Sequence, residues 1–344
     1  MGVSLASLVE GKTIDLQALS GRVIAIDTFN FLYQFLATIR GPDGAPLTNA
    51  QGDVTSHLVG LFSRTIRLVQ AGIKPVFIID GEAPDLKKKE RQRRSQLKEE
   101  AQKEFEVAKE RRDFEAMKKF ASRTSKLTRP MVDDAIEVIS AMGLPHVLAP
   151  SEGEAQAAFM ACQEDVDAIA SQDFDSLLFG APVIIRNLSI TGKRRHTKQM
   201  GYTTIMPEEI TLSEVLNSLG IDQDQLIVLG ILTGTDFNYG GIKGIGPKKS
   251  LKLLKKHGKD FDAVFSEVEW QKYWNVDWRE IMQLFQEMPV TREYSLQWAV
   301  PDTDQLRELL IGKHGFEENR VTGPLKKLEQ MRQEGQQKGL GDFF

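Results

Sequence analysis

The chain has 344 residues, a formal net charge of −4 and a hydrophobic fraction of 41%, which fits one sizeable domain with a large core and excludes a small disulfide-stabilised fold. Its single cysteine, Cys162, excludes a disulfide within the chain, and we expect that thiol to be buried. We expect no membrane association and a cytoplasmic location, because no apolar run approaches a membrane span and the N-terminus lacks the pattern of a signal peptide.

Acidic residues follow several short apolar runs. Residues 23–26, 76–79 and 168–170 resemble buried strands, and each run leads to one or two aspartates. Two glutamates open a helical stretch after residue 151, and an aspartate follows the apolar run 226–232. These acids are Asp27, Asp80, Glu152, Glu154, Asp173, Asp175 and Asp236. Because parallel strands deliver their carboxyl-end residues to one edge of a sheet, the pattern predicts an α/β fold with a central, mostly parallel sheet flanked by helices, and an acid cluster at that edge.

Clustered carboxylates need cations, because like charges a few ångströms apart raise one another's pKa. Magnesium suits such oxygen ligands, and two ions about 4 Å apart can activate a water and stabilise the leaving oxygen of a phosphodiester. Taken singly, each acid has a simpler explanation, since an aspartate at a strand end often forms a turn and Ser151 with Glu154 fits a capping box. The recurrence of the pattern favours a two-metal nuclease site.

Positive charge is concentrated between residues 87 and 129, which hold 16 Lys or Arg and 8 Asp or Glu, so this segment is +8 and the rest of the chain is −12. The segment is polar, helix-prone and inserted after the run that ends at Asp80. A solvated helical pair is one interpretation. The position of the insert favours the other, a helical arch over the acid cluster that meets a phosphate backbone.

A glycine-rich basic segment follows Asp236. Residues 240–249 read as a hairpin between two helices, with Gly244 and Gly246 in the turn and Lys248 and Lys249 in the next helix. Backbone N–H groups at such a helix start can bind a phosphate without reading bases. The pattern therefore predicts a helix-hairpin-helix DNA-binding element.

The last eight residues, 337–344, form a third signal, because a polar stretch ends in two phenylalanines. We expect Leu340, Phe343 and Phe344, with Gln337 before them, to bind a pocket on a partner.

Together these segments resemble the flap endonucleases of the archaeal kind, within the structure-specific 5′ nuclease family that includes the xeroderma-type repair nucleases. The matching motifs are Asp27–Asn30, Thr55–Leu58, Gly72–Phe77, Asp80–Gly81, Glu152–Ala157, Ser171–Asp175, Gly234–Asn238 and Gly244–Lys248. The resemblance implies a nuclease domain in two parts (1–83 and 131–238), an arch (84–130), a helix-hairpin-helix and C-terminal helical region (239–325) and a flexible tail (326–344) that binds the sliding clamp PCNA.

The resemblance also implies roles for the acids. Asp80, Glu152 and Glu154 would hold one Mg²⁺, and Asp173 with Asp175 a second. Asp27 and Asp236 would act through bound water, and Mn²⁺ could replace Mg²⁺.

Other implied roles concern DNA. Lys87 and Arg94, at the base of the arch, would contact the scissile phosphate, and Tyr33 would stack on a base. The hairpin carbonyls of Gly241, Ile242 and Ile245 would hold K⁺. Arg40 and Thr55 would belong to the pocket for an unpaired 3′ nucleotide.

The function so implied is cleavage of 5′ flap DNA at the duplex junction, leaving a ligatable nick in replication and repair, including Okazaki fragment maturation and base excision repair, with 5′–3′ exonuclease action on nicks and gaps. We expect a monomer, associated with the nucleoid of an archaeal cell. The alternatives are a related bubble or gap nuclease and a clamp-tethered junction-binding protein without catalysis.

Overall fold

The computed structural model describes residues 3, 5–41, 44–111, 113, 126–190, 192–195 and 202–328. A seven-stranded sheet with the order β1-β9-β6-β5-β2-β3-β4 forms its centre. Its strands are β1 Lys12–Thr13, β2 Val23–Asp27, β3 Lys74–Ile79, β4 His146–Leu148, β5 Ala168–Ala170, β6 Val183–Arg186 and β9 Glu208–Thr211. The strands from β6 to β4 are parallel, whereas β9 is antiparallel to both β6 and β1. The prediction of an α/β fold with a mostly parallel sheet is confirmed, and the sheet is mixed at one edge.

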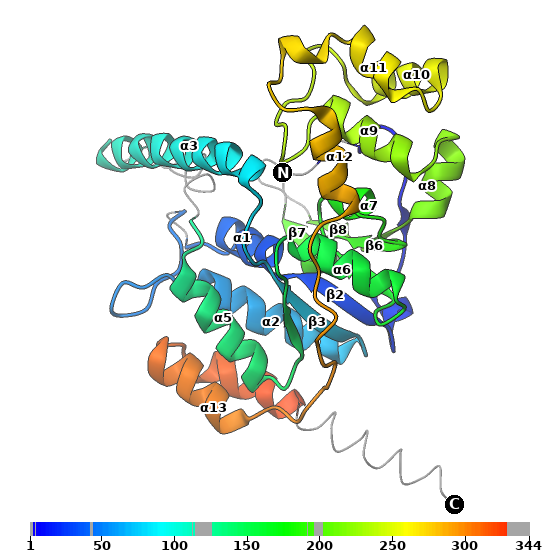
Figure 1. Cartoon of the computed structure of the whole chain (residues 1–344). Coiled ribbons are helices and arrows are strands. Elements are labelled where there is room, and N and C mark those ends of the chain that lie inside the picture. Colours follow the sequence, from blue (N-terminus) through cyan, green and yellow to red (C-terminus); the bar gives the residue numbers. More distant parts are fainter. Residues whose placement is uncertain are drawn as a thin grey trace, which may run out of the picture.

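Apart from Lys74 and Asp27 at strand ends, strands β2, β3 and β5 are apolar, because helices cover both faces of the sheet (Figure 1). Successive residues of β2 alternate between two cores: Ile24 and Ile26 belong to one, and Ala25 belongs to the other with Val76 of β3. Ala25 pairs with Val76 in register, so the strands that end at Asp27 and Ile79 finish at the same edge.

Helices divide between the two cores. The core of Ile24 packs against α1 Thr28–Thr38, α2 Ser56–Gln70, α5 Arg129–Ala141, α13 Thr303–Arg307 and the π-helical turn Glu308–Lys313. The core of Ala25 packs against α6 Gly153–Cys162, α7 Asp175–Leu178, α8 Leu212–Leu219, α9 Gln223–Thr233, α10 Pro247–His257, α11 Phe261–Glu267 and α12 Trp278–Gln286. Short 3₁₀ turns occur at Leu16–Leu19, Leu188–Ile190 and Trp270–Lys272.

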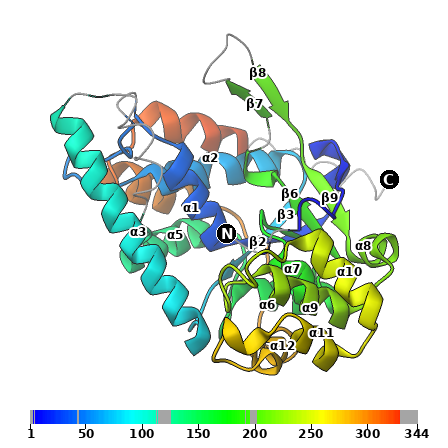
Figure 2. The same cartoon turned by 90° about the horizontal axis from the view of Figure 1, so that it is seen from above.

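One long helix, α3 Asp85–Glu110, projects from the body of the molecule (Figures 1 and 2). It begins five residues after Asp80 and lies within the segment expected to form an arch. A two-stranded antiparallel hairpin, β7 Gly192–Arg195 and β8 Tyr202–Ile205, stands apart from the main sheet (Figure 2).

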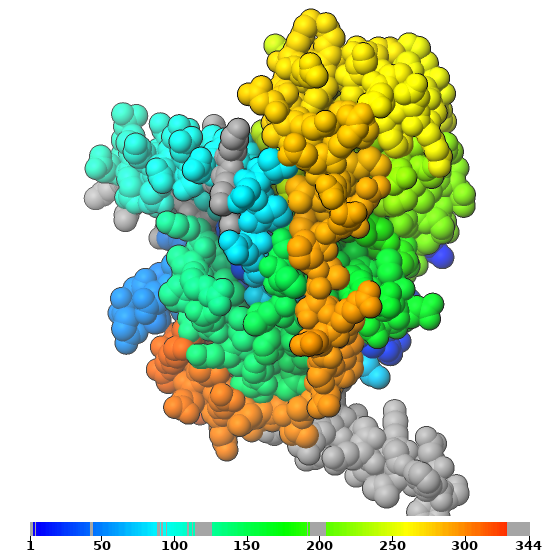
Figure 3. Space-filling view, in the orientation of Figure 1, coloured from blue at the N-terminus to red at the C-terminus, as the bar shows by residue number. Residues whose placement is uncertain are grey.

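After α12 the chain returns across the surface as an extended segment, residues 289–302 (orange in Figure 3). The Trp298 indole donates to the Pro75 carbonyl at 3.1 Å, and the Ala299 N–H donates to the Gly143 carbonyl at 2.8 Å. The segment thereby carries the chain from the core of Ala25 to that of Ile24.

Two further observations concern membrane spans and the thiol. Within the described residues no single helix is long and apolar enough to span a membrane, and the pair α8 and α9, which passes this test jointly, is bent by 80°. Cys162 is exposed, so the expectation of a buried thiol is wrong. The reason is its place as the last residue of α6, whose buried side instead carries Ala157, Met160 and Ala161.

Candidate active site

The carboxyl edge of the central strands carries the acids. Asp27 ends β2 and caps α1, accepting the Asn30 N–H at 3.0 Å, and Asp80 directly follows β3. Glu152 is the N-cap of α6 and Glu154 lies in its first turn. The remaining three acids lie between β5 and α7, at the start of α7 and after α9, and are Asp173, Asp175 and Asp236.

Hydrogen bonds from distant segments orient these carboxylates. The Asn30 amide donates to Asp173 at 3.2 Å, the Gly153 N–H donates to Asp80 at 2.8 Å, and the Val3 N–H donates to Asp175 at 2.8 Å. Because the donors come from other elements, the cluster is fixed by tertiary structure.

Two serine hydroxyls hold Glu154. Ser171 and Ser176 each donate to its Oε1, at 3.1 and 3.2 Å. Ser151 instead donates to the Glu82 carbonyl at 2.9 Å, so Ser151 and Glu154 do not form a capping box.

The acids lie near enough to perturb one another. Burial and then the charge of Asp80 raise the pKa of Asp27 to about 8. Burial and then Asp236 raise the pKa of Asp175 to about 7. Burial, Asp175 and Asp27 raise the pKa of Glu154 well above its ordinary value. These shifts have the sign expected of buried carboxyl groups that lie close together.

A lysine of α3 supplies positive charge to this cluster. The Lys87 ammonium lies 2.5 Å from Glu152 Oε2 and 3.3 Å from Asp236 Oδ2. Burial on its own would lower its pKa, but the carboxylates of Glu152 and Asp236 raise it above the ordinary value. The N-terminal end of α3, the root of the projecting helix, is thus held against the acids by the ion pairs of Lys87.

The donor set fits hard divalent cations. All seven predicted ligands offer carboxylate oxygens, and a divalent ion would favour the charged form of those carboxyls whose pKa is raised by burial and by neighbouring acids. Among the residues that the structure describes, no three Asp, Glu, His or Cys side chains already converge as ligands of one ion. Glu152, one of the predicted ligands, pairs with Lys87 through its Oε2.

The other residues predicted to contact the reacting strand lie on α1 and α3. Tyr33 is 37% exposed, with Lys98 of α3 4.5 Å from its ring centroid and 3.5 Å from its hydroxyl. Its exposure follows from α1, whose buried face is made by Phe31, Phe35 and their neighbours. Arg94 lies on α3 two turns beyond Lys87, and its side chain is outside the described part.

The glycine-rich segment forms a turn between α9 and α10. Gly246 is the N-cap of α10, Pro247 is at its first position, and the exposed Lys249 ammonium donates to the Gly244 carbonyl at 2.8 Å. Lys248 is exposed beside it.

Two of the three carbonyls proposed as potassium ligands already accept hydrogen bonds. The Gly241 carbonyl accepts the Trp274 indole N–H at 3.1 Å, and the Ile242 carbonyl accepts the Ile245 N–H at 2.9 Å. Sequence reasoning assigned no role to Trp274, because a residue 33 positions away gives no local signal.

The last predicted residues lie apart from the acid cluster or outside the described chain. Arg40 donates to the carbonyls of Ala37 and Gly44, at 3.2 and 3.0 Å. Thr55 is buried as the N-cap of α2. The residues expected to bind a clamp, Gln337, Leu340, Phe343 and Phe344, lie outside the described residues.

Comparison with known proteins identifies relatives of this chain. The XPG N-terminal domain matches residues 1–101, and the XPG I-region matches residues 143–236. Flap endonuclease 1 of Thermofilum pendens is 49% identical over 347 residues, covering 100% of this chain and 99% of that protein. Flap endonuclease 1 of Thermococcus onnurineus is 46% identical over 344 residues, with the same coverage of 100% and 99%.

Solved structures show the same fold. Flap endonuclease-1 from Methanococcus jannaschii has a TM-score of 0.74 and 41% identity, covering 95% of this chain and 98% of that chain. The catalytic core of Rad2 in complex with DNA substrate has a TM-score of 0.67 and 25% identity, covering 95% and 100%.

Proposed function

The chain belongs to the flap endonuclease 1 family of structure-specific 5′ nucleases, which hydrolyse phosphodiester bonds in DNA, and from this premise we propose how its residues divide the work. The substrate is DNA with a 5′ flap, cut where the duplex meets the single strand, and the product is a nick that a ligase can seal. The same site acts as a 5′–3′ exonuclease at nicks and gaps. The observation that carries the proposal is the acid cluster beneath the basic root of α3.

The acids serve as ligands for two Mg²⁺, which Mn²⁺ can replace. Asp80, Glu152 and Glu154 hold one ion and Asp173 with Asp175 the other, while Asp27 and Asp236 act through water. Such ions, when bound, supply an activated water and stabilise the leaving oxygen of the phosphodiester. Ser171, Ser176 and Asn30 orient the carboxylates for this task, because their hydrogen bonds fix Glu154 and Asp173.

Lys87 and Arg94 bind the scissile phosphate. Lys87 already reaches the acid cluster from α3, so a phosphate held by the ions would come within reach of its ammonium. As negative charge develops on the phosphate, a fixed cation there lowers the barrier. Tyr33, exposed on α1 six residues after Asp27, offers its ring to the neighbouring base.

The duplex binds at the turn before α10. The N-terminus of α10, where the N-cap Gly246 makes no side-chain hydrogen bond, suits a phosphate together with Gly244, Lys248 and Lys249. A K⁺ ion at Gly241, Ile242 and Ile245 would use second lone pairs, since two of these carbonyls accept hydrogen bonds already. Arg40 and Thr55 form part of the pocket for an unpaired 3′ nucleotide.

These proposed roles divide the chain into a nuclease domain, an arch, a C-terminal DNA-binding region and a tail. Residues 1–83 and 131–238 form the nuclease domain, residues 84–130 the arch, residues 239–325 the helix-hairpin-helix and C-terminal helical region, and residues 326–344 the tail. The flap passes beneath the arch, and bending at the junction selects a deformable nicked structure over continuous duplex.

Cleavage of an end-labelled double-flap DNA, beside matched duplex and bubble substrates, tests the substrate assignment. We expect one cut at the flap junction in magnesium and none with a chelator. Preferential cutting of the bubble or stepwise digestion of the duplex would contradict it.

We also propose that the tail binds the sliding clamp PCNA through Gln337, Leu340, Phe343 and Phe344, as a short motif with aromatic anchors suits a partner pocket. Deleting Phe343 and Phe344 should leave cutting by the protein alone unchanged and abolish stimulation by the clamp. Stimulation of the truncated protein to the same extent would refute the assignment. The chain acts as a monomer within the cell.

A further inference from the structure

A second cation of α3 reaches the segment that carries Asp236. The Arg93 guanidinium carbon lies 3.6 Å from the centroid of the Tyr239 ring. Its Nε and Nη2 atoms donate to the two carboxylate oxygens of Glu90 at 2.7 and 2.8 Å. Glu90 is buried, with 5% of its surface exposed, and its two hydrogen bonds hold the guanidinium in one orientation. The guanidinium carbon therefore lies over the aromatic ring, with two of its nitrogens bonded to Glu90.

The ring stands on a rigid support. Asn238, which is fully buried, accepts from the Thr235 hydroxyl at 2.7 Å and donates to the Ile231 carbonyl at 2.6 Å. Phe237 packs edge-on against Phe285 of α12, with centroids 5.2 Å apart. Tyr239 follows these anchored residues directly, so its position is set by α9 and α12 rather than by α3.

The helix and this segment meet at two points. Lys87 contacts Asp236 at 3.3 Å, and Arg93 contacts Tyr239 at 3.6 Å. Residues 236–239 form a turn, in which the Asn238 N–H donates to the Thr235 carbonyl at 3.3 Å, so the two contact points on this segment are held in a fixed arrangement. Two contacts with this segment restrict the direction of α3 more than one contact would.

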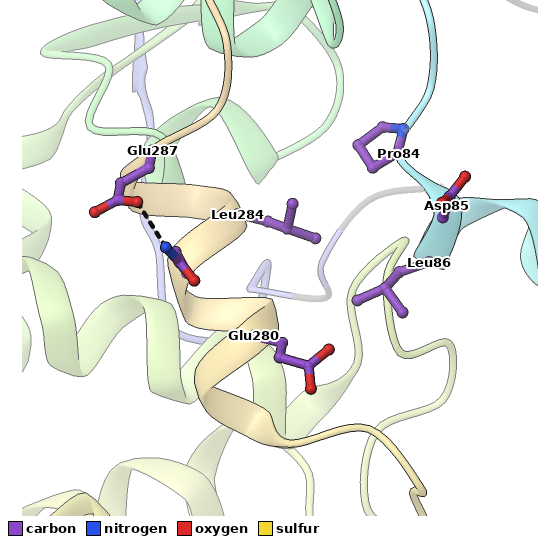
Figure 4. A pocket seen from close by; sticks show the side chains of 7 residues that line it. Pro84, Asp85, Leu86, Glu280, Leu284 and Glu287 are labelled. Carbon is purple, nitrogen blue, oxygen red and sulfur yellow. Dashed lines mark hydrogen bonds between the residues drawn. The ribbon is translucent and has the colours of Figure 1, made fainter.

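The root of α3 is otherwise loosely packed on this side. A groove of about 400 Å³ separates Pro84, Asp85 and Leu86 from Glu280, Gln283, Leu284 and Glu287 of α12 (Figure 4). Leu86 and Leu284 line this groove and pack against the core of Ala25, and further along α3 Lys98 lies 4.5 Å from the centroid of the Tyr33 ring. Arg93 adds a contact between these two points that ties the helix to the segment after α9.

We propose that Arg93 and Tyr239 are positioning residues for cleavage: their stacking sets the direction of α3 and so aims Lys87 at the acid cluster. This inference rests on the role of Lys87 in the proposed function. Neither side chain touches the reacting atoms, and both act through the orientation of the helix.

Single-turnover cleavage of a 5′ flap at saturating enzyme in magnesium, with flap affinity measured separately in chelator, tests the proposal. The variants are Arg93→Lys, which keeps the charge and loses the planar fork, Tyr239→Leu, which loses the ring, their combination, and Tyr239→Phe as the conservative control. Lys87→Ala serves as the reference. Arg93→Lys alters a side chain that is 36% exposed, so it keeps the test available if Tyr239→Leu fails to fold.

We expect Arg93→Lys and Tyr239→Leu each to slow cleavage about tenfold, because a small misplacement of a group that aligns the reactants is costly. Flap affinity should stay within about twofold, since the charge that binds phosphate is retained. The combined variant should be no slower than either single variant, because both remove one contact. Tyr239→Phe should cut normally, and amides 87–98 should exchange hydrogen faster in the two single variants.

Two results would overturn the inference alone: normal cleavage by both single variants while Lys87→Ala is slow, or losses that multiply in the combined variant. Normal cleavage by Lys87→Ala as well would overturn the proposed role of Lys87 and this inference with it.

Discussion

The Lys87 ammonium lies 2.5 Å from Oε2 of Glu152, so a cation of the projecting helix is paired with a proposed metal ligand 65 residues away. The same ammonium is 3.3 Å from Asp236, and it stays charged at neutral pH because these carboxylates raise its pKa. On the proposed ligand set, lysine and magnesium would compete for the same oxygens.

Removing Lys87 should separate metal affinity from catalysis. Lys87→Ala frees Glu152 and Asp236, so Mg²⁺ should bind more tightly, while cleavage slows at least about tenfold because the phosphate loses a cation. Titration calorimetry and single-turnover cleavage measure the two effects. Lys103→Ala, which removes an exposed lysine of the same helix, is the matched control. Weaker Mg²⁺ binding by Lys87→Ala would show that the lysine does not compete with the ion.

The acid cluster should make the metal-free protein less stable as pH rises. Asp27 and Asp175 have pKa values raised to about 8 and about 7. A carboxyl group whose pKa is higher in the folded state stabilises the fold while protonated, and this contribution is lost as pH rises through the folded-state pKa. In chelator, the free energy of unfolding should therefore fall between about pH 4 and pH 8 and level off above the folded-state pKa values, and Mg²⁺ should reverse the fall. A flat profile in chelator would contradict the shifts.

The buried His57 predicts the opposite dependence at lower pH. Burial, as the largest cause, lowers its pKa to about 4. Between about pH 6.5 and 4 the His57 side chain is protonated in the unfolded chain but neutral in the folded chain. The free energy of unfolding therefore decreases as pH falls through this range, by at most about 3 kcal/mol. Urea unfolding of the wild type and His57→Gln across this window isolates the effect as a difference in slope. Equal slopes would exclude His57 as the cause.

Tyr33 and Lys98 should exchange partners when DNA binds. Lys98 lies 4.5 Å from the centroid of the ring that is proposed to stack on a base. Tyr33→Ala should weaken productive flap binding by about 1–3 kcal/mol, the typical contribution of one aromatic stack, whereas Tyr33→Phe should keep it. Fluorescence anisotropy with a labelled flap measures both. Equal losses in the two variants would assign the effect to the hydroxyl rather than to the ring.

Local patterns foretold much of the fold and the acids. Residues 23–26 and 76–79 are continuously apolar because each strand is covered on both faces, and Asp27 and Asp80 end these strands at one edge. The helix α3 lies in a segment that was predicted to be helical and exposed, because its polar composition leaves few residues for a core.

Contacts between residues far apart in the sequence could not be predicted from local patterns. Asn30 links Asp27 and Asp173, Trp298 bonds to the Pro75 carbonyl 223 positions away, and Arg93 stacks on Tyr239. These residue types are common on protein surfaces and in cores, so their presence does not indicate a particular partner. Their partners are determined by tertiary packing. Tyr33 was placed beside the site by family resemblance alone, because apolar periodicity would bury it.

Cleavage by Asp175→Asn tests the central claim, that the buried acids bind the ions that drive hydrolysis. Asparagine keeps an oxygen for the Val3 N–H and removes one negative charge from the cluster. In magnesium, single-turnover cleavage of a 5′ flap should fall at least about 100-fold, the upper end of losses seen around metal ligands. The metal-free protein should be no less stable, since repulsion is relieved.

The matched control is Asp133→Asn, which changes an aspartate with a half-exposed side chain on α5 outside the cluster and should cut normally. Undiminished cleavage by Asp175→Asn, with normal Asp133→Asn, would contradict the account. Loss of cleavage in Asp175→Asn with intact folding and flap binding is the result that the account predicts.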